Sequence, residues 1–377
     1  MKKVKLGDLV TVMNEREDNP SQSKYDRFVG LEHYDSGSVS ITRWGSTEML
    51  VSAMKVFHRG DILVARRNVY LKRASSVDFD GITSGDSIIL HVNDEQYKDI
   101  VPFVLNTDSF WDYADQHSDG SMSKRLAPKT MLEYEFTLPD DGEVERLSTL
   151  LWSMERTKTA YKNLIAKTEE LVKSQFIEML TPYAEAGKVV LIQDMVKSDR
   201  PVTYGIVKPG TNYEGGIPVV RVKDFTDGII HTDDMLHTRP ELNAKYLRST
   251  LLEGDILLSI GGTIGRVAIV PKELEGANIT QHTARISLQS RYDPVYVKGV
   301  LESPLMQEVM AKNTLGVAQV GLNLKDIRVF PVPDVPQEEQ NFLAAFYRHA
   351  DKSKFAAQQA LADLTATQKA LMRQYLG

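Results

Sequence analysis

Two stretches of the chain place apolar residues at alternating spacings of four and three. Residues 142–180 contain no proline and have glycine only at their first position, and residues 337–376 contain neither residue type. This composition is typical of long helices. Asp140 and Asp141 suit the cap of the first helix, and Pro336 suits the first turn of the second. The pattern therefore predicts two long helices, one in the middle of the chain and one at its end.

The apolar positions of both stretches form a heptad seam. A single amphipathic helix ordinarily packs on its own domain, but two matched helices favour antiparallel packing on each other. We expect Leu151, Ile165, Leu361 and Leu371 to be largely buried in this seam. The full seam comprises Leu147, Leu151, Met154, Tyr161, Ile165, Val172 and Met179 in the first stretch and Leu343, Tyr347, Ala350, Ala357, Leu361, Leu364, Leu371 and Tyr375 in the second.

The remaining segments carry short runs rich in β-branched residues, punctuated by Gly, Asp, Asn and Pro. Examples are SIILHV at 87–92, IPVVRV at 217–222 and ARISL at 284–288. Such runs predict mixed α+β domains. The expected fold class is α+β, with two mixed α/β globular domains separated by two long antiparallel coiled-coil helices. The expected divisions are a first domain at 1–138, a central helical spacer at 139–182, a second domain at 183–333 and a distal helical spacer at 334–377.

An internal duplication relates the two halves. GDIL at 60–63 recurs at 254–257, and the following residues align Lys72 with Arg266 and Ala74 with Ala268. Further matches pair Ile82-Thr83 with Ile279-Thr280, and then Gly120, Leu126 and Lys129 with Gly316, Leu322 and Lys325. The order is therefore globular, helical, globular, helical.

Composition places the chain among soluble globular proteins and changes little else. The 377 residues are 42% hydrophobic and 25% charged, include no cysteine and carry a net charge of −6. A reducing compartment, and hence the cytoplasm, is expected. The basic start breaks at Gly7 and Asp8 before a signal-peptide core forms, and no apolar window is long enough for a membrane span. Because the global charge is acidic, nucleic-acid binding has to depend on local patches.

No catalytic motif stands above background. GGTIGR at 261–266 lacks both the spacing and the lysine of a phosphate-binding P-loop. DPVY at 293–296 approaches an amino-methyltransferase motif but lacks its second proline, so Asp-Pro at a helix start is the simpler reading. The chain has no Glu-x-Lys pair, no zinc-protease motif and no nucleophile-elbow motif. We expect neither a catalytic residue nor a metal site in this chain.

Basic and amide side chains recur instead at matching places in the two halves. Arg, Lys, Asn and Gln are the residues that contact phosphates and base edges of DNA. Each cluster alone is typical of solvated surface, but recurrence at equivalent positions favours a binding face. The candidate DNA-binding residues are Arg66, Arg67, Lys72, Arg73, Thr83, Lys124 and Arg125 in the first half and Thr263, Arg266, Thr280, Gln281, His282, Gln319, Asn323 and Lys325 in the second.

These motifs, in this order and twice over, resemble the specificity subunit of type I restriction-modification systems, over nearly the whole chain. The second half shows GDILLSIGGTIGRVAIVP, ANITQHTARI and GLNLKDIRVFPVPDVPQEEQ, and the first half shows GDILVARRNVYLKRA, GITSGDSIIL and LPDDGEVERL. The first half departs from the pattern because it lacks the GTIG glycines and the LNLKD string. The resemblance implies two target-recognition domains alternating with two helical spacers.

The resemblance also implies a function in DNA methylation and defence against phage, without catalysis by this chain. Implied partners are double-stranded DNA, two methyltransferase subunits that carry S-adenosylmethionine and methylate adenine, and two restriction subunits that use ATP and Mg²⁺. No cofactor is implied in this chain and no membrane is involved. The target is expected to be asymmetric and bipartite, because two diverged domains read two different half-sites.

Three alternatives stay open at this point. The chain could be a non-catalytic coiled-coil adaptor, the specificity subunit of a related type IIB-like system, or an enzyme with a dispersed active site. If the helices set the gap of the target, a four-residue insertion after Lys167 with a matched one after Asp363 should widen the gap by nearly two base pairs, since four residues add about 6 Å.

Overall fold

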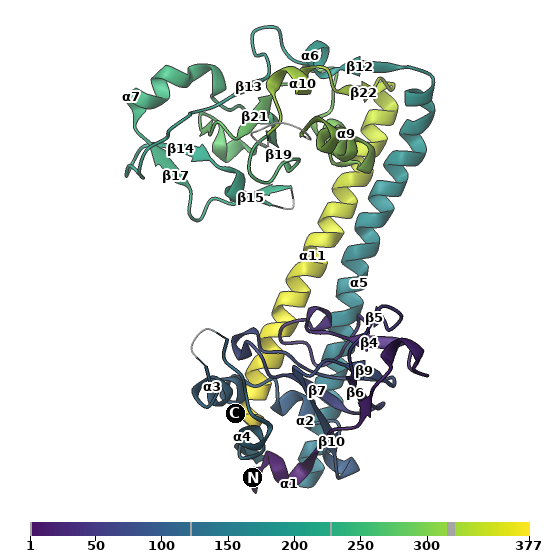
Figure 1. The fold of residues 1–377 in the computed structure, drawn as a ribbon. Coiled ribbons are helices and arrows are strands. Elements are labelled where there is room, and N and C mark those ends of the chain that lie inside the picture. The colour runs from purple at the N-terminus through teal and green to yellow at the C-terminus, as the bar shows by residue number, and fades with distance from the viewer. Residues whose placement is uncertain (1, 121–122, 227, 315–320) are drawn as a thin grey trace. The chain divides into compact units, whose positions relative to one another are not determined.

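The computed structural model describes residues 2–120, 123–226, 228–314 and 321–377. The chain divides into two compact units, Met1–Asn163 with Ala357–Gly377, and Leu164–Ala356. Each unit joins a globular domain to parts of two long helices, α5 (Asp141–Glu185) and α11 (Gln337–Leu376), as Figure 1 shows. The expected helical stretches 142–180 and 337–376 lie within α5 and α11.

A four-stranded antiparallel sheet forms the centre of each domain. In the first unit its order is β2-β10-β7-β8, and in the second the order β13-β21-β18-β19 repeats it strand for strand. The duplication inferred from the sequence is therefore a duplication of topology. The strands are β2 (Val10–Met13), β10 (Ser87–Val92), β7 (Ile62–Ala65) and β8 (Ala74–Ser76), then β13 (Thr203–Tyr204), β21 (Thr283–Ile286), β18 (Ile256–Ser259) and β19 (Val267–Ile269).

A second sheet in each domain contains one parallel strand pair at equivalent places, β4 with β9 and β14 with β20. The first unit has the order β3-β6-β9-β4-β5, and the second has β17-β14-β20. Beside β20 the described residues form a 3₁₀ helix, η6 (Ala244–Ser249), where β6 lies in the first unit. The strands are β3 (Arg16–Glu17), β6 (Met54–Phe57), β9 (Gly81–Thr83), β4 (Arg27–Val29) and β5 (Gly45–Ser46), then β17 (Leu236–Thr238), β14 (Ile217–Val220) and β20 (Asn278–Ile279).

Shorter elements surround these sheets. A two-stranded pair, β1-β11 or β12-β22, joins the start of each domain to the segment that leads into its long helix. The first unit contains β1 (Lys2–Lys5), α1 (Leu6–Leu9), α2 (Val101–Val104), α3 (Asp108–Gln116), α4 (Pro128–Leu132) and β11 (Glu135–Leu138). The second contains β12 (Val189–Leu191), α6 (Ile192–Met195), β15 (Phe225–Thr226), β16 (Ile229–Ile230), α7 (Pro240–Asn243), α8 (Pro294–Glu302), α9 (Pro304–Thr314), α10 (Leu324–Arg328) and β22 (Pro331–Pro333).

The repeated GDIL motif is a turn that leads into the central strand. Gly60 and Gly254 adopt φ of 93° and 82°, a left-handed conformation that glycine reaches without a Cβ clash. The aspartate that follows closes the turn, because Asp61 accepts the His58 backbone N–H at 2.8 Å and Asp255 accepts that of Leu252 at 2.9 Å. The Ile-Leu pair then enters the buried strand. The GDIL motif is therefore explained by the conformation of this turn and not by a catalytic or binding role.

The ends of both long helices belong to the domain cores. In the first unit Leu147 and Leu151 of α5 share a core cluster with Met372 and Leu376 of α11. In the second unit the C-terminal part of α5, with Phe176 and Leu180, and the N-terminal part of α11, with Leu343, share another. Each domain is thus closed by one segment from each helix, so packing on the domain and packing between the helices occur together.

The two helices pack antiparallel within each unit, as the seam predicts. In the first unit the Lys158 ammonium donates to Gln368 Oε1 at 2.8 Å. In the second unit Tyr183 donates to Glu339 at 2.6 Å, and the rings of Phe176 and Tyr347 meet edge to face with centroids 6.2 Å apart. Residue numbers fall along one helix as they rise along the other, which defines the direction.

Burial along the seam is less complete than the pattern predicts. Leu151 is fully buried, whereas Ile165, Leu361 and Leu371 are half-buried. Leu151 is therefore enclosed as a core residue, and the other three are covered only in part. A pair of helices covers each seam residue from one side only, and Leu151 is enclosed because the first domain covers its other side.

The structure also shifts the alignment of the two halves by one residue beyond β7. Pairing of β7 with β8 and of β18 with β19 makes Ala74 equivalent to Val267, and hence Arg73 equivalent to Arg266. The sequence-based match of Lys72 with Arg266, and of Ala74 with Ala268, is wrong by that residue. Lys72, at φ 46°, instead takes the left-handed place of Gly265, at φ 88°.

Candidate nucleic-acid interface

Two basic segments of the first domain, distant in sequence, lie side by side. Arg67 and Arg125 form an isolated antiparallel bridge. The Asn68 backbone N–H donates to the Lys124 carbonyl at 2.9 Å, and that of Leu126 donates to the Arg66 carbonyl at 2.9 Å. The structure therefore joins the cluster after β7 to the cluster before α4 along one edge of the domain.

Asp86 lies between the two arginines that bridge these segments. Its carboxylate is 3.6 Å from Arg67 and 3.5 Å from Arg125. Both guanidinium groups are open to solvent, with side-chain exposures of 43% for Arg67 and 51% for Arg125, against 28% for Asp86. Arginine offers a planar fork to guanine, and a carboxylate accepts from the cytosine amino group. This cluster has the chemistry to contact a base pair.

The two lysines of the first set are paired with acids on α3. Lys72 reaches Asp108 at 2.7 Å, and Lys124 reaches Asp115 at 2.7 Å. Such exposed pairs contribute little to stability and exchange readily for another anion. Both lysines remain able to contact a phosphate, at the cost of breaking the existing pair.

Two expected residues are held by the protein's own backbone. Arg73 donates from its two terminal nitrogens to the carbonyls of Leu31 and Arg67, both at 3.0 Å, and burial lowers the pKa of its guanidinium. Thr83 is fully buried and donates to the Val29 carbonyl at 2.7 Å. The structure therefore removes Thr83 from the surface and commits Arg73 to bracing the turn beside β4.

In the second domain the equivalent of Arg73 plays the same part. Arg266 donates to the carbonyls of Val222 at 3.3 Å and Phe225 at 3.5 Å. Val222 begins the 3₁₀ helix η5 (Val222–Asp224), as Leu31 begins η2 (Leu31–His33) in the first domain. This equivalence explains an arginine after the turn in both halves by structure alone.

The glycine-rich turn 261–265 borders an open groove of about 490 Å³ in the second domain. Gly261 lies against the His282 ring, which a Cβ at that position would overlap. The Ile260 backbone N–H donates to the His282 carbonyl just as that of Arg66 donates to Asp86, so His282 takes the place of Asp86. The groove is lined by Val207, Pro209, Arg221, Val222, Lys223, Gly261, Gly262, Thr280, Gln281 and His282.

The other expected residues of the second domain lie apart from this lining. Thr263 is exposed in the turn, and Lys325 is exposed on α10. The Asn323 amide donates to Asp326 at 3.2 Å at the start of that helix. Gly321 bridges to Gly261, so the segment before α10 meets the glycine turn as its counterpart does in the first domain. Gln319 lies outside the described residues.

Sequence reasoning missed two cations that line the groove, Arg221 and Lys223, and the pair Arg16 and Lys55 in the first domain. Lys223 is exposed and pairs with Asp234 at 2.9 Å. Arg16 and Lys55 lie directly opposite each other on β3 and β6. None of these residues belongs to a run of basic residues, so the sequence offered no signal for them.

Among the described residues there is no group of three or more His, Cys, Asp or Glu side chains placed to hold a metal ion. None of the helices in the described part of the chain is both long and apolar enough to cross a membrane.

Comparison with known proteins identifies the domain type of the second half of the chain. Residues 190–361 match the type I restriction modification DNA specificity domain. Outside that segment the chain is similar to type I restriction-modification specificity subunits. It is 29% identical over 288 residues to the type I restriction enzyme EcoBI specificity subunit of Escherichia coli, a match that spans 67% of this chain and 60%, less than two thirds, of that relative.

Solved structures with low identity confirm the α+β fold class expected from the sequence. The type I restriction-modification S subunit from M. genitalium superposes with a TM-score of 0.63 at 13% identity, covering 100% of this chain and 96% of that one. A chain from a structure describing complex assembly and conformational transition of the type I R-M system gives 0.57 at 19% identity, covering 99% and 97%. The likeness extends over both halves, including the first half that the domain match does not reach.

Proposed function

We propose that this chain recognises an asymmetric, bipartite DNA target for a type I restriction-modification system. The observation that carries the proposal is that the two domains share one sheet topology but present different side chains beside it. The two central sheets repeat strand for strand, while the turns beside them present Arg67 and Asp86 in one domain and Gly261 and His282 in the other. Identical domains read palindromes, whereas two diverged domains in one chain read two unlike half-sites.

In this proposal the chain has no catalytic role and no resident cofactor. Two methyltransferase subunits supply S-adenosylmethionine and methylate adenine, and two restriction subunits use ATP and Mg²⁺. The net charge of −6 supports this assignment of roles, because an acidic chain repels DNA overall. Partner subunits are therefore proposed to supply part of the phosphate contacts. The chain itself contributes local cations and the base-reading groups.

The test is genome-wide mapping of methylated adenines in cells that express this chain with its methyltransferase partner. The expected result is one motif with two unlike half-sites separated by a fixed unread gap. Exchanging the first domain for that of a relative should change one half-site and leave the other. A coiled-coil adaptor would give no motif that depends on this chain, and an enzyme would modify DNA without the partner.

A further inference from the structure

Two cations face each other across the strand pair β3-β6 of the first domain. Arg16 lies directly opposite Lys55, and Lys55 lies opposite Thr83 on β9, so the three side chains stand on the same face of the sheet. Like charges directly opposite on neighbouring strands are destabilising. The pair therefore concentrates positive charge on this face of the sheet.

The Lys55 side chain extends from β6 toward Asp86 and Ser87, beside the basic segments of Arg67 and Arg125. Its ammonium donates to the Ser87 carbonyl at 2.9 Å, one residue beyond Asp86. Burial lowers the pKa of Lys55, and the positive charges of Arg66 and Arg16 lower it further. Arg66 therefore belongs to the same neighbourhood, and its backbone N–H donates to the Asp86 carbonyl at 2.9 Å.

No carboxylate forms an ion pair with Arg16, Lys55 or Arg66 within the part of the chain that the structure describes, although most other cations of this domain are paired. Lys5 pairs with Glu133 at 2.7 Å and Arg43 with Asp35 at 2.7 Å, for example. Asp86 raises the pKa of Lys55 against the effects of burial and of the neighbouring cations, but it lies within ion-pair distance of Arg67 and Arg125 rather than of these three cations. In addition, Arg66 Nε is buried without a hydrogen-bond partner among the described residues.

We propose that Arg16, Lys55 and Arg66 form a phosphate-binding site on the first domain, which grips the DNA backbone beside the base-reading cluster of Arg67, Asp86 and Arg125. A phosphate relieves the repulsion among the three cations. Contacts of this kind position a protein on duplex DNA and carry no sequence information. The inference rests on the DNA-recognition function proposed above.

Among its described residues, the second domain has no strand equivalent to β6, although η6 in that place carries the exposed Lys245 and Arg248. The place of β6 is taken by η6, where the Ser249 hydroxyl donates to Asn278 Oδ1 at 2.7 Å, a neutral contact. The two domains therefore differ in how they hold DNA as well as in what they read.

The test is the salt dependence of DNA binding by the full chain in complex with its methyltransferase partner. The probes are one duplex that carries the mapped target and one that lacks it. Lys55→Gln and Arg16→Gln should weaken binding to both duplexes by the same factor, and each should make the plot of log affinity against log salt shallower by about 1. Lys55→Arg keeps the charge and should restore the slope, and none of these changes should alter the methylated motif.

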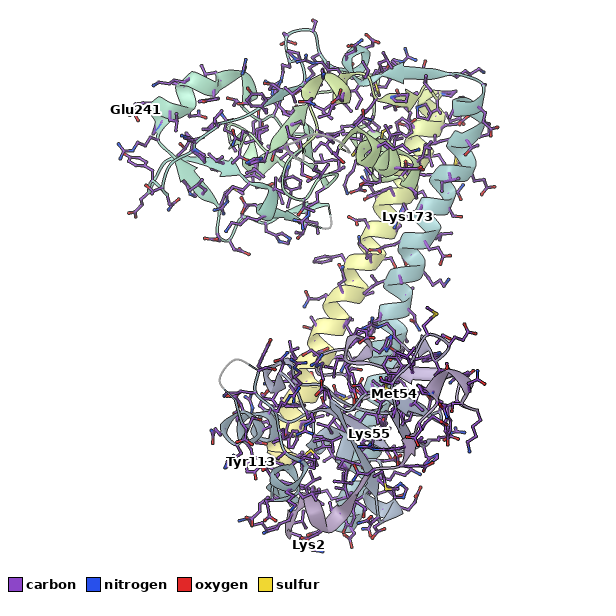
Figure 2. The ribbon with its side chains drawn as sticks, viewed as in Figure 1. Lys2, Met54, Lys55, Tyr113, Lys173 and Glu241 are labelled. Atoms are coloured by element: carbon purple, nitrogen blue, oxygen red, sulfur yellow. The ribbon has the colours of Figure 1, made fainter. Side chains whose placement is uncertain are left out.

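Lys2→Gln is the matched control, because Lys2 is an exposed strand lysine elsewhere in the same unit, as Figure 2 shows. It should leave the slope unchanged. If the unmodified complex discriminates between the duplexes but Lys55→Gln and Arg16→Gln bind with an unchanged slope, the phosphate site is wrong and the proposed function stands. If the unmodified complex does not discriminate, the proposed function itself fails. A variant that changes the preferred base at one position without changing the slope would make its residue a base reader and overturn the assignment.

Discussion

Lys158 of α5 and Gln368 of α11 form a buried polar contact between the two long helices. The Lys158 ammonium donates to Gln368 Oε1 at 2.8 Å and to Glu155 at 2.6 Å, and both Lys158 and Gln368 are buried. The duplication places Lys354 at the equivalent point of α11, where it lies 3.6 Å from Glu169 and from Asp351. Polar groups in an apolar seam specify alignment, because a shifted register leaves them unpaired.

The Lys158–Gln368 contact gives a prediction about stability. Gln368→Leu should destabilise the chain by about 1–3 kcal/mol, because it removes an acceptor from a buried ammonium. The double variant Lys158→Met with Gln368→Leu, compared in a Glu155→Gln background so that no carboxylate is left unpaired, should recover most of that loss, since it replaces both partners by apolar groups. Urea unfolding of the three proteins measures the difference. A double variant no more stable than Gln368→Leu alone would show that the contact is not coupled.

The uneven burial of the seam predicts unequal effects of the same substitution. Leu151→Asp should cost several kcal/mol, on the order of a lost core side chain plus an unpaired charge, because Leu151 is fully buried. Leu361→Asp should cost clearly less, because a half-buried carboxylate stays hydrated. Thermal and urea unfolding supply the comparison, with exposed Ala362→Asp as the control. Equal losses at Leu151 and Leu361 would contradict the burial found along the helices.

The left-handed backbone at Lys72 predicts an unusual preference for glycine. Lys72→Gly and Lys72→Ala both remove the pair with Asp108, but only glycine relieves the conformation at φ 46°. The glycine variant should be the more stable of the two by about 1 kcal/mol. At exposed Tyr70, on the same turn, the order should reverse, since glycine there only adds freedom to the unfolded chain. Urea unfolding of the four variants decides it.

The Arg67–Asp86–Arg125 cluster predicts a localised loss of specificity. Arg125→Ala should weaken binding to the target by about 1–3 kcal/mol and relax the preference at one base pair, whereas Lys124→Ala should weaken all sequences about equally. The methylated motif and duplex titrations give the two readouts. The assignment of this face to DNA binding would be refuted if the complex lost no binding after neutralisation of five cations together, namely Arg66, Arg67, Arg125, Lys72 and Lys124. Arg73 is left out, because its loss would disturb the turn that it braces.

The antiparallel register refines the prediction about the gap of the target. Lys354 lies across from Glu169, so the partner of an insertion after Lys167 is one after Phe355 rather than after Asp363. A heptad inserted at both places keeps the seam in phase and adds about 10 Å, which corresponds to about three base pairs. The methylated motif should keep its half-sites and gain that gap. An active variant with the original gap would show that the helices do not set the spacing.

Local pattern was sufficient for the elements that depend on neighbours in sequence. The heptad period of 142–180 and 337–376 predicted α5 and α11, and the repeated GDIL predicted equivalent turns, because helix periodicity and turn conformation follow from nearby residues. The antiparallel direction also followed from the order of the matched halves. The sequence by itself therefore determined the duplicated architecture.

Tertiary structure alone decided which charged residues are available to a ligand. By sequence Arg73 is a surface cation in a basic run, yet it donates hydrogen bonds to two backbone carbonyls. Arg16 and Lys55 are distant in sequence but lie opposite each other on paired strands. Whether a cation is paired depends on acids brought near by folding, as Lys72 is by Asp108. The one-residue shift at Lys72 has the same origin, because left-handed backbone is recognisable from glycine at 265 but not from lysine at 72. Long-range packing, which no local pattern encodes, determines these contacts.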